Sequence, residues 1–298
     1  MNKRAKAKAY DLTVNVGDTG YADDYTAGHN AKIFDQHFRN IEEHAATSPF
    51  MCVAGNHEAQ YKFAGYRNRL IMPKVSGASA AMAPFYYSFD YGPVHFLSYS
   101  SEHSFATGSE QWKFIKADLE AASAPAARKT RPWIVVWSHR PLYCSDLMTW
   151  EDRCIHEATE YRANIEAILL EAGVDVHISG HNHQYERSWP VGGCSSEYKD
   201  CNISHSYDNP GRPVHIVNGA GGDVEGIDNS WIKEQDRVPF RAYNDQGFHT
   251  GYSEVTVNMT HLHWEFFYSG DGAFPFQNIT KPLQAGERVD NFVISKQL

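Results

Sequence analysis

The sequence predicts an α/β fold with helices packed on sheet and a β-rich C-terminal part from about residue 213. Short apolar runs rich in β-branched residues, each closed by a polar loop, are typical of buried strands. Segments with apolar residues at helical spacing separate several of these runs, which is the order of βαβ units. Near the C-terminus, residues 251–257 and 261–268 alternate apolar and polar side chains, as antiparallel strands do.

The N-terminal part predicts a first βαβ unit. Residues 12–16 form a short apolar run that ends at a glycine, which predicts a strand followed by a loop. Residues 29–46 carry apolar side chains at helical spacing, and residues 50–54 form the next apolar run. We therefore expect strand, helix and strand in this order.

The middle of the chain continues the same alternation. Residues 86–90 and 94–99 predict a hairpin, and Ser109 is placed to cap the helix that follows. Residues 133–137 are entirely apolar and predict a buried strand.

A helix and further strands follow. The helix is expected over 157–172, with Gly173 as its stop, and a strand over 174–178. Another strand is expected over 214–217, followed by a polar stretch to about Gly247. After residue 268 we expect an extended end.

Composition limits the classes of function. The chain has 298 residues, 42% of them hydrophobic, which is enough for one large core, so we expect a single domain over 1–298. The net charge of −9 gives no basic surface for nucleic acid. No apolar run approaches the roughly 18 residues of a membrane span. A protein acting on small molecules, without nucleic-acid or membrane partners, fits best.

The five cysteines predict two disulfides. The pairs Cys144–Cys154 and Cys194–Cys201 each close a short polar loop, whereas Cys52 lies in an apolar run and is expected to be a free thiol. Each bond would contribute roughly 2.5–3 kcal/mol on a chain-entropy argument.

The sequence is ambiguous about cellular location. Sequons at Asn202, Asn258 and Asn278 agree with a secreted glycoprotein. The charged N-terminus lacks the apolar segment of a signal peptide. Either the protein is cytosolic, or its natural beginning is absent from this chain.

Metal-ligand side chains follow four predicted strands. His181 and His183 follow one strand, His139 a second, Asn56 and His57 a third, and Asp18 and Tyr21 a fourth. Each could serve in a turn or a strand end, as many polar residues do. Because the carboxyl ends of strands in one sheet face one crevice, we expect these side chains to form one site.

Their chemistry suits a binuclear metal centre. A carboxylate such as Asp18 can bridge two cations about 3.5–4 Å apart, and such a pair activates water and clamps an in-line displacement at phosphorus. Tyr21 offers a hard anionic oxygen, which favours a trivalent ion such as Fe(III) over Zn(II).

These blocks resemble a known family. Residues 17–21 (GDTGY), 55–58 (GNHE), 136–139 (VWSH) and 180–183 (GHNH) are similar, in order and spacing, to four of the five motifs of the purple acid phosphatases, which are calcineurin-like metallophosphoesterases. The resemblance implies a β-sandwich flanked by helices in α-β-β-α layers. It also implies a secreted acid phosphatase that hydrolyses phosphate monoesters of small molecules with Fe(III) and a divalent ion, Zn, Mn or Fe.

The resemblance also implies roles for individual residues. Asp18 would bridge the metals, Tyr21 and His183 would hold Fe(III), and the divalent ion would be held by three further side chains, Asn56, His139 and His181. His57 would bind the substrate phosphate. A further histidine would protonate the leaving group, with His156 as the first candidate for this role and His249 as the second.

One family motif is absent. The first, an Asp-x-Gly that supplies another Fe(III) ligand, has no counterpart, and Asp11 precedes its strand where a ligand would have to follow it. We therefore expect an N-terminally truncated catalytic domain, a poor enzyme whose activity and metal affinity rise when the chain is extended. A phosphodiesterase of the wider superfamily and a non-enzymatic glycoprotein that binds phosphate or a partner remain alternatives.

Overall fold

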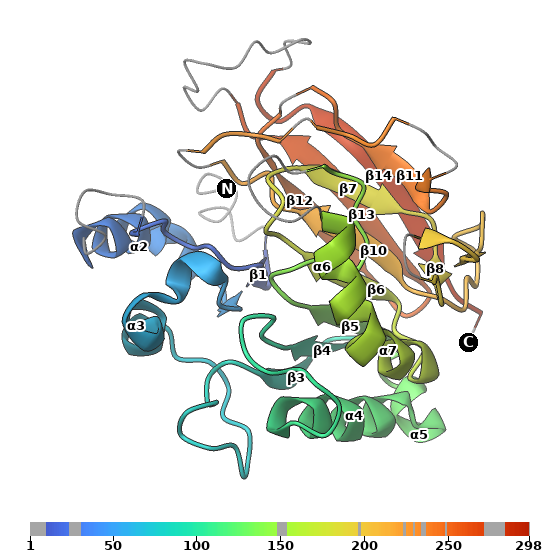
Figure 1. The fold of residues 1–298 in the computed structure, drawn as a ribbon, viewed down its shortest axis with the longest axis horizontal. Helices are drawn as coiled ribbons and strands as arrows, with labels where there is room; N and C mark the ends of the chain where they lie inside the picture. The colour runs from blue at the N-terminus through green and yellow to red at the C-terminus, as the bar shows by residue number, and fades with distance from the viewer. Residues whose placement is uncertain are drawn as a thin grey trace.

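The computed structural model describes residues 10–23, 31–147, 154–195, 198–222, 225–228, 230–233, 237–247, 249–270 and 284–297. Its centre is a sheet of seven strands in the order β11-β7-β10-β6-β5-β4-β3 (Figure 1). In chain order these strands are β3 (Tyr87–Tyr91), β4 (Val94–Ser98), β5 (Trp133–Trp137), β6 (Val176–Ser179), β7 (Tyr185–Ser188), β10 (Val214–Asn218) and β11 (Arg241–Asn244). Strands β4, β5, β6 and β10 are parallel, so their carboxyl ends share one edge of the sheet.

Three smaller sheets complete the β structure. Antiparallel pairing joins β12 (Gly251–Val257), β13 (His261–Tyr268) and β14 (Arg288–Ser295). Parallel pairing joins β1 (Thr13–Asn15) to β2 (Phe50–Cys52), and β8 (Val191–Gly192) pairs with β9 (Asn202–Ile203).

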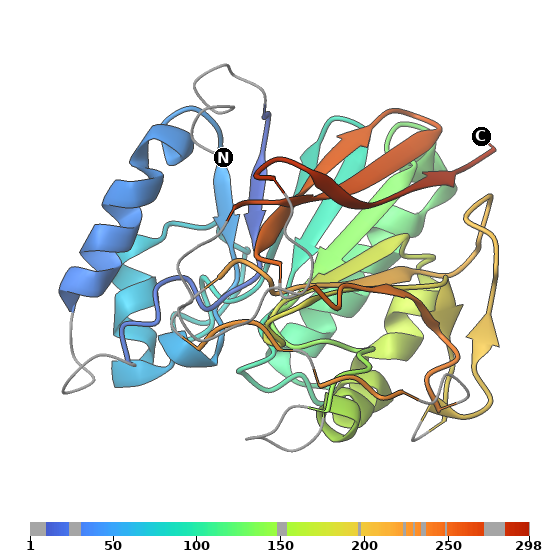
Figure 2. The same ribbon diagram turned by 90° about the horizontal axis from the view of Figure 1, so that it is seen from above.

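The helices lie in two groups. On one side of the molecule, beside β1 and β2, are α2 (Ala31–Ala45) and α3 (Gln60–Arg69), as Figure 2 shows. The short η1 turn (Asn56–Glu58) precedes α3. The helices on the large sheet are α4 (Glu110–Ser123), α5 (Pro125–Arg128), α6 (Cys154–Tyr161) and α7 (Ala167–Glu171), with a π-helical segment, Arg162–Glu166, between α6 and α7.

Alternate side chains of β5 point to opposite faces of the large sheet, and each face packs against a different layer. Ile134 and Val136 pack into the core beneath α4, α6 and α7. Trp133, Val135 and Trp137 pack into a second core that includes residues of β12–β14 and β2. Both faces of β5 are therefore buried, as expected for an all-apolar parallel strand. The expected β-sandwich flanked by helices is confirmed.

Most predicted elements are present. The strands expected over 133–137, 251–257 and 261–268 coincide with β5, β12 and β13. Ser109 caps α4, because the backbone N–H of Trp112 donates to its hydroxyl (3.2 Å). Gly173 has a φ of 62° just past α7, the left-handed conformation of a helix stop.

Several elements were missed. The stretch expected to be polar to about Gly247 contains β11, and the extended end contains β14. Strand β7 lies shortly after His183, where no strand was expected. The helix expected over 157–172 begins three residues earlier and is interrupted by the π-helical segment. Strand β7 was not predicted because it contains Glu186 and Arg187, whose polar side chains are typical of loops. Both side chains are buried, and Arg187 pairs with Asp290 of β14 (2.8 Å).

Both predicted disulfides are present, and Cys52 is a buried free thiol. Cys144 and Cys154 differ from the prediction in their surroundings, because both are buried within the core under the helices. This disulfide fixes the first residue of α6 to the segment after β5.

Two buried histidines face each other across β6 and β10. His177 and His215 are register partners with ring centroids 5.5 Å apart. Burial lowers the pKa of His177 to about 3. Burial, together with the neighbouring His177, also holds the pKa of His215 well below its usual value.

This depressed pKa predicts acid sensitivity. The unfolded chain protonates His215 near pH 6.5 and the folded chain does not, so stability is complete above that pH and falls below it. Between about pH 7 and pH 5 the loss from this residue is about 2 kcal/mol. We expect His215→Phe to lack this loss in denaturant unfolding curves, and the exposed His205→Phe to retain it. Equal pH slopes in both variants would contradict the assignment.

Candidate metal centre

Loops after β1, β2, β5 and β6 converge at the carboxyl ends of these strands. They bring together Asp18, Asn56, His139 and His181, and Tyr21 and His183 lie beside them. The expectation that all the strands belong to one sheet was wrong, because β1 and β2 form a sheet of their own. Two sheets therefore contribute to the site, because the carboxyl ends of β1 and β2 and those of β5 and β6 meet at the candidate metal centre.

Three potential ligand atoms from different loops lie close together, and one of them is Nε2 of His139. Its Nε2 lies 3.0 Å from Oδ2 of Asp18 and 2.9 Å from Oδ1 of Asn56. Its Nδ1 lies 2.8 Å from the carbonyl oxygen of Val16, which can only accept, so Nδ1 carries a hydrogen. In the neutral ring, Nε2 then presents a lone pair to two oxygen acceptors. This arrangement is repulsive unless a proton or a metal cation lies among the three atoms.

His181 belongs to the same group. Its Nδ1 lies 3.0 Å from Oδ1 of Asn56, and one ligand atom each of Asp18, His139 and His181 lie within 4.8 Å of one another. An amide oxygen, a carboxylate and two imidazoles are a donor set typical of divalent ions.

A second group adjoins the first through Asp18. The phenol oxygen of Tyr21 lies 2.6 Å from Nε2 of His183 and 3.4 Å from Oδ2 of Asp18. Oδ2 of Asp18 therefore contacts a ligand atom of each group, Nε2 of His139 in the first and the phenol oxygen of Tyr21 in the second. This is the geometry required of a residue that bridges two cations.

Three of these residues have a strained backbone, as do several residues elsewhere in the described chain. Asp18, Tyr21 and His181 have φ values of 51°, 46° and 66°, in the left-handed region that non-glycine residues rarely occupy. Such strain costs on the order of 1–3 kcal/mol per residue and persists where the surroundings over-determine the conformation. Strain at three neighbouring ligand-type residues supports a functional site.

Close packing of the loops requires glycine at two places. A Cβ on Gly55 would overlap the carboxylate of Asp18, and a Cβ on Gly180 would lie 2.8 Å from Cγ2 of Val16. The loops after β1, β2 and β6 can therefore approach this closely only with glycine at these positions.

Charge stabilises the ionised form of Asp18. Burial would raise the pKa of this carboxyl, but His139, with smaller contributions from His57 and His181, lowers the pKa far below its usual range. Asp18 is thus an anion when a cation enters.

The three remaining predicted residues, His57, His156 and His249, differ in their surroundings. His57 stacks on Tyr21 (ring centroids 4.2 Å apart), and its Nδ1 contacts Asp23 (3.1 Å). His156 is exposed on α6. His249 is buried and its Nδ1 contacts Asp245 (2.9 Å). The structure therefore brings His57 against a ligand-type side chain, while the role of His156 stays a prediction.

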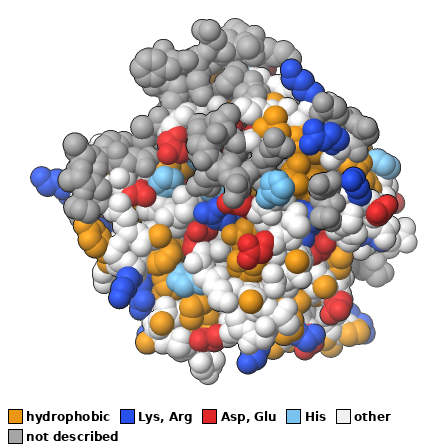
Figure 3. All heavy atoms as spheres, in the orientation of Figure 1, with side chains coloured by type: hydrophobic (Ala, Val, Ile, Leu, Met, Phe, Trp, Pro, Cys, Tyr) orange, Lys and Arg blue, Asp and Glu red, His pale blue; other side chains and the backbone are white. Residues whose placement is uncertain are grey.

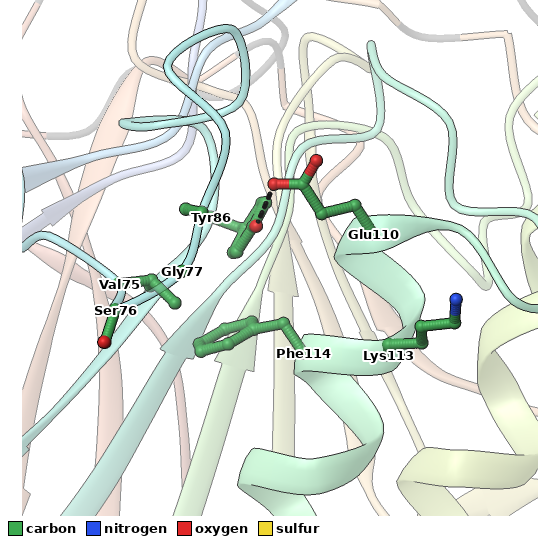
Figure 4. Close-up of a pocket in the computed structure, with 8 residues that line it drawn as sticks. Val75, Ser76, Gly77, Tyr86, Glu110, Lys113 and Phe114 are labelled. Atoms are coloured by element: carbon green, nitrogen blue, oxygen red, sulfur yellow. Dashed lines mark hydrogen bonds between the residues drawn. The ribbon is translucent and has the colours of Figure 1, made fainter.

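Another hollow lies elsewhere, between the loop at residues 75–78 and α4 (Figure 4). It has a volume of about 420 Å³, and at its rim the hydroxyl of Tyr86 donates to the Glu110 carboxylate (2.7 Å). It shares no residue with the candidate metal centre.

Comparison with known proteins agrees with the geometry. The calcineurin-like phosphoesterase family matches residues 1–185, and the family described as iron/zinc purple acid phosphatase-like protein C matches residues 212–274. The chain belongs to the calcineurin-like phosphoesterases, and its C-terminal part matches the purple acid phosphatase-like family.

The chain matches only part of the length of individual relatives. It is 34% identical to acid phosphatase type 7 of Danio rerio, over 89% of this chain and 60% of the relative. It is 30% identical to purple acid phosphatase 22 of Arabidopsis thaliana, over 88% of this chain and 55% of the relative. The fold is similar to a purple acid phosphatase from yellow lupin (Lupinus luteus) seeds, with a TM-score of 0.75, 24% identity and coverage of 99% and 48% of the two chains. The chain thus spans about half to three fifths of these relatives.

Sequence reasoning gave Glu58 no role, although it belongs to the GNHE block. Its buried carboxylate accepts the backbone N–H groups of Gly55 (2.7 Å), Asp18 (2.9 Å) and Thr19 (2.7 Å). Burial and the charge of Asp18 raise the pKa of Glu58 to about 7. One carboxylate therefore ties the loop that carries Asp18 to the loop that carries Asn56.

The chain should lose stability when the acceptor oxygens of Glu58 are removed. We expect Glu58→Ala to lower the free energy of unfolding by about 2–3 kcal/mol, because the buried backbone N–H groups of Gly55, Asp18 and Thr19 would lose their acceptor. Glu42→Ala, on the exposed face of α2, is the matched control. The measurement is urea denaturation of chelator-treated protein, and equal midpoints for both variants would exclude the tying role.

Proposed function

We propose that this chain hydrolyses phosphate monoesters at acidic pH with a binuclear Fe(III)–M(II) centre, where M is Zn, Mn or Fe. The observation that carries the proposal is the close approach of the acceptor atoms of Asp18, Asn56 and His139. Those atoms fit a cation, because a cation converts their mutual repulsion into ligation.

The residues would divide between two ions. Tyr21 and His183 would hold Fe(III), and the hard phenolate oxygen suits that ion. Asn56, His139 and His181 would hold the divalent ion, and Asp18 would be shared, as its contacts with both groups support. When bound, such a pair of metals supplies an activated water and stabilises the attacking and leaving oxygens of a displacement at phosphorus.

The chain's own residues would orient the substrate. His57 lies against Tyr21, with Asp23 on its Nδ1 side, and a histidine at acidic pH carries a hydrogen on both ring nitrogens. The other ring nitrogen would then donate to a phosphate oxygen. A charge-assisted bond of this kind is among the stronger hydrogen bonds in proteins. His156 remains the proposed donor to the leaving group.

A small phosphoester is the proposed substrate. Among the described residues on the face drawn in Figure 3, acidic and basic side chains are interspersed, which does not favour a large charged partner on that face. Among the described residues, no helix is long and apolar enough to cross a membrane.

Secretion is the proposed location. Two disulfides are typical of an oxidising compartment. Asn202 and Asn258 are exposed, as glycosylation requires, while Asn278 lies outside the described residues.

Colour tests the trivalent site. We expect protein reconstituted with iron and zinc to show a visible tyrosinate–Fe(III) charge-transfer band that Tyr21→Phe abolishes. Tyr61→Phe, at a tyrosine that is 64% exposed, should keep the band. Absorption spectra beside elemental analysis measure both effects. A colourless protein with two metals would exclude Tyr21 as an iron ligand.

Turnover tests the reaction class. With a chromogenic phosphomonoester at acidic pH, we expect His139→Ala to lose at least about 100-fold in kcat/KM, because even the supporting residues of metal sites contribute 10–100-fold. The exposed His205→Ala is the control. Faster hydrolysis of a phosphodiester would favour the phosphodiesterase alternative. Phosphate binding without hydrolysis of either ester would favour the non-enzymatic one.

A further inference from the structure

A chain of alternating charges lies behind His181, on the side away from Asn56. Arg140 donates from Nε to Glu102 (2.9 Å) and from NH1 to Glu157 (2.6 Å). The other oxygen of Glu157 lies 3.5 Å from Nε2 of His181. The order is therefore carboxylate, guanidinium, carboxylate, imidazole, with its last member in the candidate metal centre.

The two ring nitrogens of His181 have different surroundings. Nδ1 faces Oδ1 of Asn56 (3.0 Å), within the group of ligand atoms. If Nδ1 supplies the lone pair for the divalent ion, Nε2 must carry the hydrogen of the neutral ring. Two neighbours compete for Nε2: the carboxylate of Glu157 (3.5 Å) can accept a hydrogen from it, whereas Nη1 of Arg140 (3.2 Å) can only donate to it. Nη1 has a shorter contact with Glu157 itself (2.6 Å), which leaves the second carboxylate oxygen for Nε2.

We propose that Glu157 is a positioning residue that fixes the hydrogen of His181 on Nε2 and so directs the lone pair of Nδ1 to the divalent ion. Arg140 and Glu102 act through Glu157, because a guanidinium that donates to two carboxylates holds both in place. The inference rests on the proposed function, because it assumes that a divalent ion binds at His181. Carboxylates that accept from the second nitrogen of a metal-bound histidine raise its basicity as a ligand.

The fold makes this contact rigid. Glu157 is three residues into α6, which starts at Cys154, and the Cys144–Cys154 disulfide joins that start to the segment after β5. The sulfur of Cys154 lies 3.6 Å from Oδ1 of Asn182, the residue between His181 and His183. The start of the helix and the histidine loop thus lie side by side, and the disulfide anchors the helix that carries Glu157.

The experiment compares Glu157→Gln with Glu160→Gln, which removes an exposed carboxylate from the same helix. Nitrogen-15 NMR of histidine-labelled, metal-free protein reports which nitrogen of His181 carries the hydrogen. Chelator competition on iron-loaded protein gives the Kd for Zn²⁺. We expect Glu157→Gln to shift the His181 tautomer and to weaken Zn²⁺ binding about 10- to 100-fold. Glu160→Gln should match the unsubstituted chain, and all three proteins should keep the tyrosinate–Fe(III) band.

Each other result has a definite meaning. Unchanged Zn²⁺ affinity and tautomer in Glu157→Gln would overturn the inference and leave the proposed function intact. Loss of the iron band together with a lower Tm would also overturn it, because Glu157 would then be merely structural. If the unsubstituted chain binds no Zn²⁺, the proposed function fails and the inference with it. Should Glu157→Gln not fold, Glu102→Gln decides, with a smaller shift in the same direction expected.

Discussion

The structure around the candidate centre depends on one electrostatic constraint. The lone pair of His139 Nε2 and the oxygens of Asp18 and Asn56 point at one another from three loops, at about hydrogen-bond distance. Only a positive charge makes this arrangement favourable. Other local features serve the same convergence: glycines where loops touch, strained backbone at Asp18, Tyr21 and His181, and the Glu58 carboxylate that ties two loops together.

The layered core makes that convergence possible. Strand β5 buries both faces, one against helices and the other against β12–β14, so the position of its carboxyl end is determined by packing on two sides. Close-packed interiors transmit such constraints because small displacements create voids or clashes. The loops that follow β5 and β6 therefore start from rigid points. Their ligand-type side chains can be held against repulsion before any cation binds.

Local patterns predicted some elements well and others not at all. Strands β5, β12 and β13 were predicted to the residue, because their apolar or alternating side chains reflect the burial of each face. Strand β7 was missed because Glu186 and Arg187 look like loop residues. Their burial is stabilised by distant partners: Arg187 pairs with Asp290, 103 residues later, and Glu186 accepts the backbone N–H of Ser145. No local window contains such partners.

The sequence by itself determined which ligand chemistries are available and that they follow strand ends, because residue type and strand periodicity are local properties. It also determined the disulfide pairs, which are near neighbours in the chain. Only the tertiary structure decided that two separate sheets meet at the site, that Glu58 joins two of its loops, and that Glu157 is the α6 residue that reaches His181 while His156 faces solvent. Those outcomes depend on the packing of segments far apart in the chain, and the direction of a side chain on a helix is settled by what that helix packs against.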